Sequence, residues 1–254
     1  LNPLDSNCNV PRTDAICVSQ LSFANYIDPG ILYYRPDVKI FLPFRFYFYN
    51  IPELFNPNKY NKFFTALGRD NLGGLVDNIS YTAPPSPLLS QYLELDPSQF
   101  CNGDQPMNCG GICRCTHLIK VPLNSIVELV LVDEVQAPGI NHPFHLHGSP
   151  FHVMGNGKMP NPNESISLEK AIELDRQNLL NRQYNLPPAK DTITIPSNGY
   201  VVLRFRANNP GFWLLHCHFL MHLLTGMSAV LQVGSLYDLP PVPRNFPRCG
   251  NFLT

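Results

Sequence analysis

The pattern of hydrophobic and polar positions along this chain is mainly that of short β-strands. Apolar, β-branched and aromatic residues fill brief segments that end at Pro, Gly or Asn, as strands joined by tight loops do. The clearest of these segments are residues 125–135, 192–196, 200–207, 212–218 and 227–234. Many short strands without an internal repeat predict an all-β fold, and we expect a Greek-key β-sandwich.

The N-terminal part of the chain differs in character from the remainder. Phe44, Phe46 and Phe48 alternate with residues of the opposite face, which predicts a half-buried strand, but the residues before it are polar and contain proline. We interpret residues 1–66 as the tail of a preceding domain plus a linker. Residues 67–254 then form the domain that contains the other strands.

One stretch has the spacing of a helix instead of a strand. Residues 163–182 place apolar side chains three and four positions apart, and Asn163 is a suitable N-cap. We therefore expect one helix inserted between the strands, beginning at Asn163.

Composition narrows the classes of function. Charged residues make up 15% of the chain and the net charge is −1, so no basic face indicates a nucleic-acid partner. No apolar run reaches the ~18 residues of a membrane span. The hydrophobic fraction of 44% can build a sizeable core, and 26 prolines favour strands and rigid loops over long helices.

The cysteines indicate an oxidising compartment. Four of the eight crowd into one short stretch, at Cys101, Cys109, Cys113 and Cys115. We expect disulfides there, with a four-cysteine zinc knot as the alternative. If Cys217 is a metal ligand, seven cysteines remain, so one thiol is free or pairs outside the chain, and Cys249 is a candidate for it. Glycosylation sequons at Asn78 and Asn163 fit a secreted protein.

Two short motifs contain six of the eight histidines. They are NHPFHLHG at residues 141–148 and HCHFLMH at residues 216–222. Because side chains alternate between the faces of a strand, two neighbouring strands would sort these residues onto two faces. One face would collect four imidazoles, from His145, His147, His216 and His218. The other face would collect Cys217 and His142.

Each face has its own chemistry. Cys217, His142 and His222, with the thioether of Met227 ten residues after the cysteine, make the ligand set of a blue-copper electron-transfer site. Thiolate and thioether favour Cu(I), whereas imidazole also tolerates Cu(II). The face with imidazoles alone suits copper that reacts with dioxygen. The peptide around Cys217 would join the two sites.

These motifs resemble the two C-terminal copper motifs of multicopper oxidases, the group of laccases and ascorbate oxidases. The resemblance extends over most of the chain and looks most like an arthropod laccase, on the segments DVKIFLPFRF, PPSPLLSQY, PLNSIVELVLVDEV and NGYVVLRFRANNPGFWLLHCHF. It implies cupredoxin domains. It also implies that His142, Cys217 and His222 are type-1 copper ligands with Met227 in the axial position. By the same resemblance His145 is a type-2 ligand, and the type-3 ligands are His147, His216 and His218.

The resemblance implies one-electron oxidation of a small diphenol, with four electrons reducing dioxygen to water at a trinuclear copper cluster. That cluster takes eight histidines, four of them from two H-x-H motifs in an N-terminal domain, and this chain has no further H-x-H. We therefore expect a complete type-1 site and half of the trinuclear cluster. An N-terminal cupredoxin domain, in the same precursor or in a separate chain, would supply the other half. Alone, this chain is expected not to reduce dioxygen.

Three alternatives stay open from the residues. An electron-transfer module would use the type-1 ligands but leaves the four imidazoles without a role. A cupin-type single-metal enzyme fits the Gly and H-x-H of the first motif but has no use for Cys217. A secreted disulfide-rich structural protein would bind no copper. Outside the motifs, we expect His117 to be an exposed or hydrogen-bonded loop residue and His152 to be structural.

Overall fold

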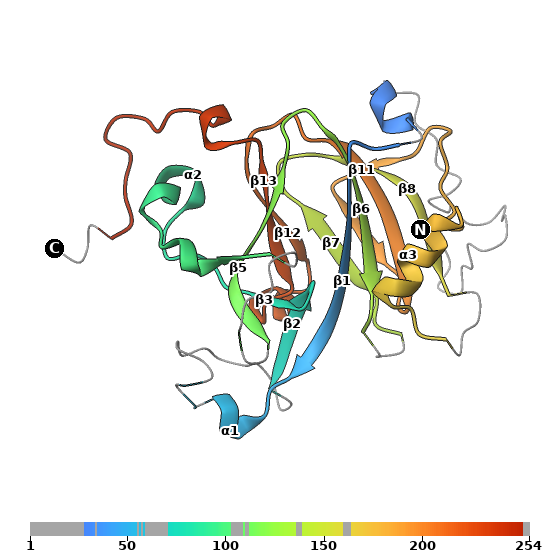
Figure 1. Cartoon of the computed structure of the whole chain (residues 1–254), viewed down its shortest axis with the longest axis horizontal. Helices are drawn as coiled ribbons and strands as arrows, with labels where there is room; N and C mark the ends of the chain where they lie inside the picture. The colour runs from blue at the N-terminus through green and yellow to red at the C-terminus, as the bar shows by residue number, and fades with distance from the viewer. Residues whose placement is uncertain are drawn as a thin grey trace.

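The computed structural model describes residues 28–33, 35–54, 56, 58, 71–102, 109, 112–135, 139–159 and 164–250. Within these residues strands dominate and the helices are short (Figure 1). The expectation of an all-β fold is thereby confirmed. In the part of the chain that is described, no helix is long and apolar enough to cross a membrane.

The described strands form one hydrogen-bonded path in the order β10–β7–β12–β13–β5–β3–β2–β1–β6–β11–β8–β9, with β4 paired to β5 beside it. One half of the path contains β1 (Val38–Phe48), β2 (Leu72–Val76), β3 (Ile79–Tyr81), β6 (Ile126–Asp133), β8 (Phe151–Lys158), β9 (Ala189–Lys190) and β11 (Gly199–Arg206). The other half contains β4 (Phe100–Cys101), β5 (Cys113–Val121), β7 (His142–Leu146), β10 (Thr192–Ile195), β12 (Gly211–Cys217) and β13 (Ser228–Val233). The five strands predicted from the hydrophobic pattern match β6, β10, β11, β12 and β13 to within two residues at each end.

The two halves of the path pack against each other over the main core. β5 connects them, because its first residues pair with β3 and its last residues pair with β13. Buried side chains from both halves meet between the layers, among them Leu42, Phe44, Leu129, Leu131, Leu203, Phe144, Leu146, Leu215 and Leu231. Each of these strands turns one face inward, and the barrel-like sandwich follows from burying those faces together.

Helix α3 (Leu168–Arg176) lies in the predicted helical stretch but is shorter at both ends. Its N-cap is Ser167, whose hydroxyl accepts a hydrogen bond from the backbone three residues on, and the expected cap Asn163 lies outside the described residues. The helix stops before residue 182, because Asn178 adopts a left-handed backbone conformation with φ of 57°. α3 packs over the outer face of β6, β8 and β11 with Ala171 and Leu174.

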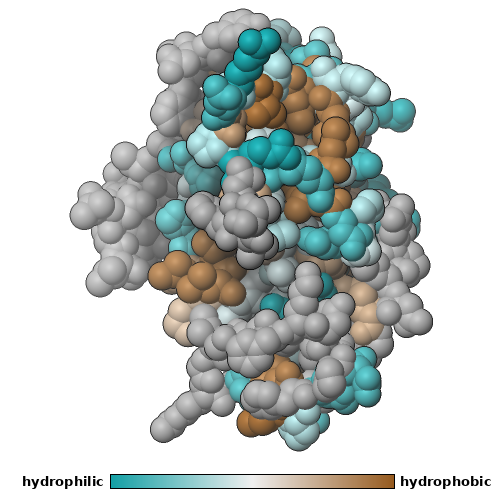
Figure 2. Space-filling view, turned by 90° about the vertical axis from the view of Figure 1, so that its left-hand side faces the viewer, coloured by the Kyte–Doolittle hydropathy of each residue, from teal (hydrophilic) through white to brown (hydrophobic). Residues whose placement is uncertain are grey.

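The opposite outer face is covered by short helices and turns. α2 (Leu88–Gln91) and the 3-10 turns Tyr92–Glu94 and Pro97–Gln99 cover β5, β12 and β13, where the Tyr92 ring stacks on Phe212 at 5.3 Å between centroids. Seen from this side, apolar side chains lie among hydrophilic ones (Figure 2). The remaining helical segments are Pro29–Leu32, α1 (Ile51–Leu54), α4 (Leu220–Leu224) and Leu236–Asp238.

Strand β1 is part of the same sheet as the strands that follow it. It runs parallel to β6, with Val38 opposite Val127 at one end of the register, and antiparallel to β2. The predicted strand is therefore confirmed, with Phe44 buried in the core and Phe48 60% exposed at the end of the strand. The domain boundary after residue 66 stays a prediction, but the walls of the core include β1.

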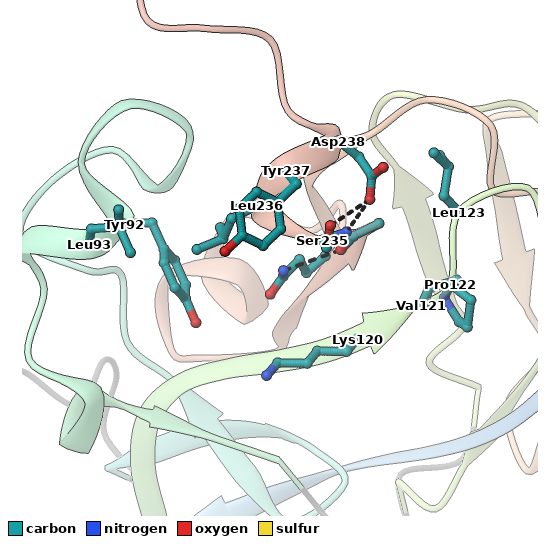
Figure 3. A pocket seen from close by; sticks show the side chains of 12 residues that line it. Tyr92, Leu93, Lys120, Val121, Pro122, Leu123, Ser235, Leu236, Tyr237 and Asp238 are labelled. Carbon is teal, nitrogen blue, oxygen red and sulfur yellow. Dashed lines mark hydrogen bonds between the residues drawn. The ribbon is translucent and has the colours of Figure 1, made fainter.

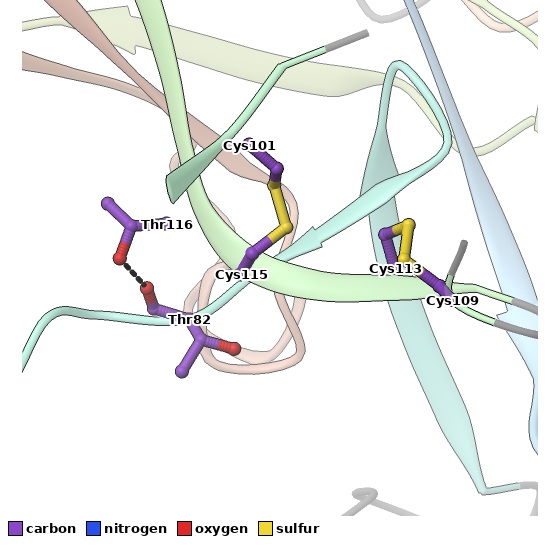
Figure 4. Close-up of a disulfide and its surroundings, with 6 residues drawn as sticks. All are labelled: Thr82, Cys101, Cys109, Cys113, Cys115 and Thr116. Atoms are coloured by element: carbon purple, nitrogen blue, oxygen red, sulfur yellow. Dashed lines mark hydrogen bonds between the residues drawn. A yellow bond between two sulfur atoms is a disulfide. The ribbon is translucent and has the colours of Figure 1, made fainter. Parts of the chain in front are cut away.

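The cysteine-rich stretch forms disulfides, as expected. Cys101 is bonded to Cys115, and Cys109 is bonded to Cys113 (Figure 4). The first of these bonds ties β4 to β5, beside the hydrogen bond from the Thr116 hydroxyl to the Thr82 carbonyl. Among the described cysteines, Cys217 is free and buried, and Cys249 is free and exposed.

A buried ion-pair network joins the outer face of the sheet to α3 and to the N-terminal turn. Glu128 is fully buried and accepts hydrogen bonds from Arg204 at 2.7 Å and from Arg182 at 2.7 and 3.1 Å. Arg182 also pairs with Asp175 on α3. Burial by itself would raise the pKa of Glu128, but Arg182 and Arg204 outweigh burial and leave this pKa below its ordinary value.

His117 is not the exposed or hydrogen-bonded loop residue that its position after the cysteine cluster suggested. It lies on β5 opposite Cys101, is completely buried, and neither ring nitrogen has a hydrogen-bond partner within the described residues. The disulfide-bonded β4 covers this stretch, which local sequence does not reveal. Burial lowers the pKa of His117 to about 4, because the charged ring would lose its hydration there.

We expect the buried His117 to lower the free energy of unfolding at acidic pH. The ordinary histidine pKa is 6.5, so between pH 6.5 and pH 4 an unfolded chain binds a proton at this site that the folded chain does not. The free energy of unfolding of metal-free protein should therefore fall by about 3 kcal/mol as the pH drops through this window, and this contribution should be constant below it. Denaturant titrations of the wild type and His117→Phe at several pH values measure the difference.

The control for this prediction is His152→Asn, since His152 is only half-buried on β8 and its ring bonds to the Pro187 carbonyl. His222 also has a pKa lowered to about 4, and its contribution is common to all three proteins. A His117→Phe variant with the same acid sensitivity as the wild type would contradict the assignment.

Candidate metal centre

The predicted ligands lie around one antiparallel pair of strands, β7 and β12. In this register His216 is opposite His145 and Cys217 is opposite Phe144. The backbone N–H of His218 continues the contact by donating to the Pro143 carbonyl. Because side chains alternate along each strand, this pairing separates the histidines of one face from Cys217 on the other, as the spacing predicted.

One face of the strand pair carries four imidazoles. Ring centroids lie 4.8 Å apart for His145 and His147, 5.3 Å for His147 and His216, and 5.6 Å for His216 and His218. The Nε2 atoms of His147 and His216 are 3.2 Å apart, so both point toward the same space. The structure thus brings together the four histidines that the sequence assigned to this face.

The rings of this face are oriented by bonds on their far side. Nδ1 of His145 lies 2.9 Å from both the Asp191 carbonyl and the Thr192 hydroxyl, and Nδ1 of His216 lies 3.0 Å from the Cys217 carbonyl. When Nδ1 donates to these oxygens, Nε2 keeps its lone pair for a metal. Burial, with the neighbouring rings, lowers the pKa of His216, which favours the neutral ligand form.

The opposite face brings Cys217 next to His222, with His142 beside them. Cys217 is fully buried, and its Sγ lies 3.5 Å from Nδ1 of His222. The rings of His142 and His222 have centroids 5.0 Å apart. Met227 is completely buried, and its carbonyl accepts the N–H of Cys217 at 3.1 Å while its N–H donates to the His222 carbonyl at 2.9 Å. These backbone bonds hold the α4 turn under β12.

The N-terminal strands form the wall of this face. The rings of Phe44 and Phe46 contact His142 edge-on at 5.1 and 5.7 Å, and Phe46 also contacts His222 at 4.8 Å. β2 approaches so closely at Gly74 that a Cβ there would lie 2.8 Å from the Met227 side chain. Sequence reasoning did not identify Phe46 or Gly74 as part of the site, because their place depends on β1 and β2 packing over the motifs.

Several features fit a bound metal. His142 is completely buried, yet neither of its ring nitrogens has a hydrogen-bond partner within the described residues. Burial lowers the pKa of His222 to about 4 and raises the pKa of the Cys217 thiol to about 11. A neutral imidazole is a ligand as it stands, whereas the thiol must lose its proton to become one. Together, one thiolate, two imidazoles and a thioether match copper better than zinc or a hard cation.

The side chains are not closed around a point in this structure. Among the described residues, no three His, Cys, Asp or Glu side chains are arranged so that they could hold one metal ion as they stand. The donors on each face are neighbours. The match to copper rests on their chemistry and on the ring nitrogens of His142, which have no hydrogen-bond partner among the described residues.

An open pocket of about 850 Å³ lies elsewhere, at the far ends of β5 and β13. Its lining includes Tyr92, Lys120 and Gln232 and none of the predicted ligands (Figure 3). The candidate site is therefore defined by its side chains and not by this pocket.

One acidic residue of the site was not identified from the sequence. Asp133, at the end of β6, is 1% exposed and has Oδ2 3.5 Å from Nδ1 of His142. The available signal was an acid at the end of an otherwise apolar run, VLVD, on the side of the strand that faces the core. Only the packing of β6 against β7 shows which side chain it meets.

Comparison with known proteins shows which family this chain resembles. The sequence profile of the multicopper oxidases matches residues 81–236. Laccase-2 of Oryza sativa subsp. japonica is 33% identical over 203 residues, which are 73% of this chain and 34% of that protein. Laccase-11 of Arabidopsis thaliana is 30% identical over 202 residues, with coverage of 73% and 34%. The chain thus spans about a third of the length of these relatives, and the resemblance to arthropod laccases in particular stays a prediction.

Two solved structures share the fold. The multicopper oxidase Fet3p superposes with a TM-score of 0.51 at 22% identity, covering 93% of this chain and 40% of that one. The L499M mutant of the laccase from B. aclada gives a TM-score of 0.51 at 18% identity, covering 87% and 31%. These likenesses show the expected cupredoxin fold. With the matched profile over residues 81–236, they lead to one conclusion: the chain belongs to the multicopper oxidase family.

Proposed function

We propose that this chain is the C-terminal part of a laccase-type oxidase that couples the oxidation of diphenols to the reduction of dioxygen to water. The observation that carries the proposal is that the β7–β12 pair places four imidazoles on one face and Cys217 on the other, where His222 of α4 lies beside it. Cys217, His142, His222 and Met227 would form a type-1 copper site. The donors of a trinuclear cluster would be His145, His147, His216 and His218.

Copper in these positions would supply one-electron redox chemistry. The protein would contribute a buried thiolate, neutral imidazoles and rigid backbone bonds that keep Met227 under Cys217. Cys217 lies between His216 and His218 in the chain, so three consecutive residues would carry donors for both sites. That continuity would allow electrons to pass between the faces through covalent bonds.

Diphenol would approach at the rim of His222. This residue is partly exposed on α4, and it is surrounded by exposed apolar side chains of Phe219, Leu220, Met221 and Leu224. Such a surface can bind an aromatic ring. A ring bound there would touch the edge of His222, which is itself one of the proposed copper ligands. Electrons removed from the diphenol at this rim would pass to the opposite face, where the four imidazoles would hold the copper that reacts with dioxygen.

The four imidazoles would be half of a cluster. The motifs supply one H-x-H pair from each strand, and an N-terminal cupredoxin domain of the same precursor or of another chain would supply the remaining four histidines. On this proposal, residues 1–66 are the tail of the preceding domain and its linker. The disulfides and the sequon at the exposed Asn78 support a secreted protein.

Copper content and spectra test the proposal directly. We expect about one copper per chain, with the intense blue absorption and narrow hyperfine splitting of a thiolate–copper site. Phenol oxidation should be absent until an N-terminal domain is added. Four coppers per chain with dioxygen consumption would overturn the half-cluster assignment, and a copper-free, colourless protein would overturn the proposed function.

A second function applies to the chain without its partner. If one face holds the full type-1 donor set and the other only four imidazoles, the isolated chain would act as a one-electron carrier without catalysis. Reversible reduction and reoxidation by small redox mediators, without dioxygen uptake, would distinguish this carrier from the oxidase.

A further inference from the structure

Asp133 is a buried acidic residue in an otherwise apolar part of the core. β6 turns Leu129, Leu131 and Asp133 toward the main core, and Asp133 is 1% exposed. Its Oδ1 accepts the backbone N–H of Val135 at 2.8 Å. Its Oδ2 has no hydrogen-bond partner within the described part of the chain. A buried carboxyl oxygen without a partner is costly, so its presence calls for a physical reason.

A ring nitrogen of His142 lies close to this oxygen. Nδ1 of His142 lies 3.5 Å from Oδ2, and His142 is completely buried, with neither ring nitrogen hydrogen-bonded to any residue that the structure describes. The Phe44 ring packs edge-on against the imidazole at 5.1 Å, and Phe44 pairs with Asp133 across β1 and β6. The imidazole and the carboxyl group are therefore enclosed together, at a separation close to hydrogen-bonding distance.

We propose that Asp133 is a positioning residue that accepts a hydrogen bond from the His142 ring nitrogen not used by copper, and so selects the tautomer that binds the metal and favours Cu(II) over Cu(I). This inference rests on the proposed type-1 site. Asp133 itself is not a ligand in this assignment. It acts through His142.

The physical argument has two parts. A neutral imidazole has one N–H and one lone pair, so an acceptor at one nitrogen leaves the lone pair at the other for the metal. Outer partners of this kind orient the ring and increase its basicity, and their loss typically weakens metal binding about 10–100-fold. In addition, a negative charge near the site stabilises the more positive oxidised metal.

The contact can be tested without any metal. In copper-free protein, nitrogen NMR of the histidine rings should show one fixed tautomer for His142, with an exchange-protected ring N–H. Asp133→Asn should abolish that fixed tautomer, and Asp133→Glu should restore it at least in part. A wild-type His142 that exchanges freely between tautomers, or one unchanged in Asp133→Asn, would overturn the inference whatever the metal does.

The consequence is tested in copper-loaded protein. Asp133→Asn should weaken Cu(II) binding about 10–100-fold. It should also lower the ratio of Cu(II) to Cu(I) affinity about tenfold, which is a rise of 59 mV in a one-electron reduction potential. Titration with Cu(II) and with Cu(I), together with potentiometry of the blue band, measures both quantities.

The matched control is Glu134→Gln, one residue further along the chain. Glu134 is half-buried, and its Oε1 accepts the Leu168 N–H at 2.7 Å, a bond that glutamine can keep. This variant removes the same charge at nearly the same place without touching His142, and we expect changes below about threefold. Equal effects of Asp133→Asn and Glu134→Gln would overturn a specific role for Asp133. A wild type that binds no copper would instead refute the proposed function, and the NMR result would still decide the contact.

Discussion

Replacing Cys217 with serine is expected to abolish the blue absorption and to reduce Cu(II) affinity by more than the about 10–100-fold typical of outer-shell changes. The reason is chemical, because serine is almost isosteric but its hydroxyl stays protonated and is a hard donor. In the buried position of Cys217, the hydroxyl also has no anionic form to offer at neutral pH. Visible and electron paramagnetic spectra, with copper analysis after dialysis, give the result.

Cys249→Ser is the control for this substitution. Cys249 is the other free cysteine of the described residues, and it is exposed near the end of the chain. Its replacement should leave spectra and copper content unchanged. If Cys217→Ser kept the blue band, or if Cys249→Ser lost it, the assignment of the thiolate ligand would be wrong.

Replacing Glu128 with glutamine is expected to lower the free energy of unfolding by about 3–5 kcal/mol. Arg204 is 1% exposed and would keep its charge while losing its buried anionic partner. Arg182 would lose its ion pair with residue 128 and keep the one with Asp175. The effect is large because an uncompensated charge in the core loses hydration without a replacement. Denaturant unfolding followed by tryptophan fluorescence measures it.

The comparison variant is Glu173→Gln, which breaks the exposed pair with Lys170 on α3. Exposed pairs contribute little, so this variant should unfold like the wild type. The double variant Glu128→Leu with Arg204→Met, which removes both charges, should recover part of the stability lost in Glu128→Gln. A wild-type unfolding free energy for Glu128→Gln would show that the network contributes no net stability.

The sorting of the two motifs' side chains onto opposite faces was predictable because it depends on local geometry. Alternation along a strand is a property of the backbone, so HPFHLH and HCH sort their side chains wherever the strands lie. The same holds for β6, β10, β11, β12 and β13, whose apolar runs end at turn residues. The position of helix α3 was predicted, but its two ends were not. Ser167 caps its start and the left-handed backbone of Asn178 follows its end, and several nearby residues could have played either part.

What the sequence could not reveal depends on contacts between distant segments. The burial of His117 follows from its place opposite Cys101, and the pairing of Cys101 with Cys115 selects one of several possible disulfides. Likewise, β1 enters the sheet beside β6, although its flanking residues suggested a separate segment. Loop closure and sheet pairing join residues that are far apart in the sequence, so a short stretch of sequence cannot predict them.

The sequence by itself determined the all-β class and predicted two sets of donor side chains, one of them soft, because residue type and a period of two suffice for these. Only the tertiary structure decided that Cys217 and His222 come within 3.5 Å, that Phe44 and Phe46 wall the site, and that Asp133 meets His142. The physical reason is that a ligand's identity is a local property, whereas its neighbours, its burial and its pKa arise from segments that meet only when the two layers pack.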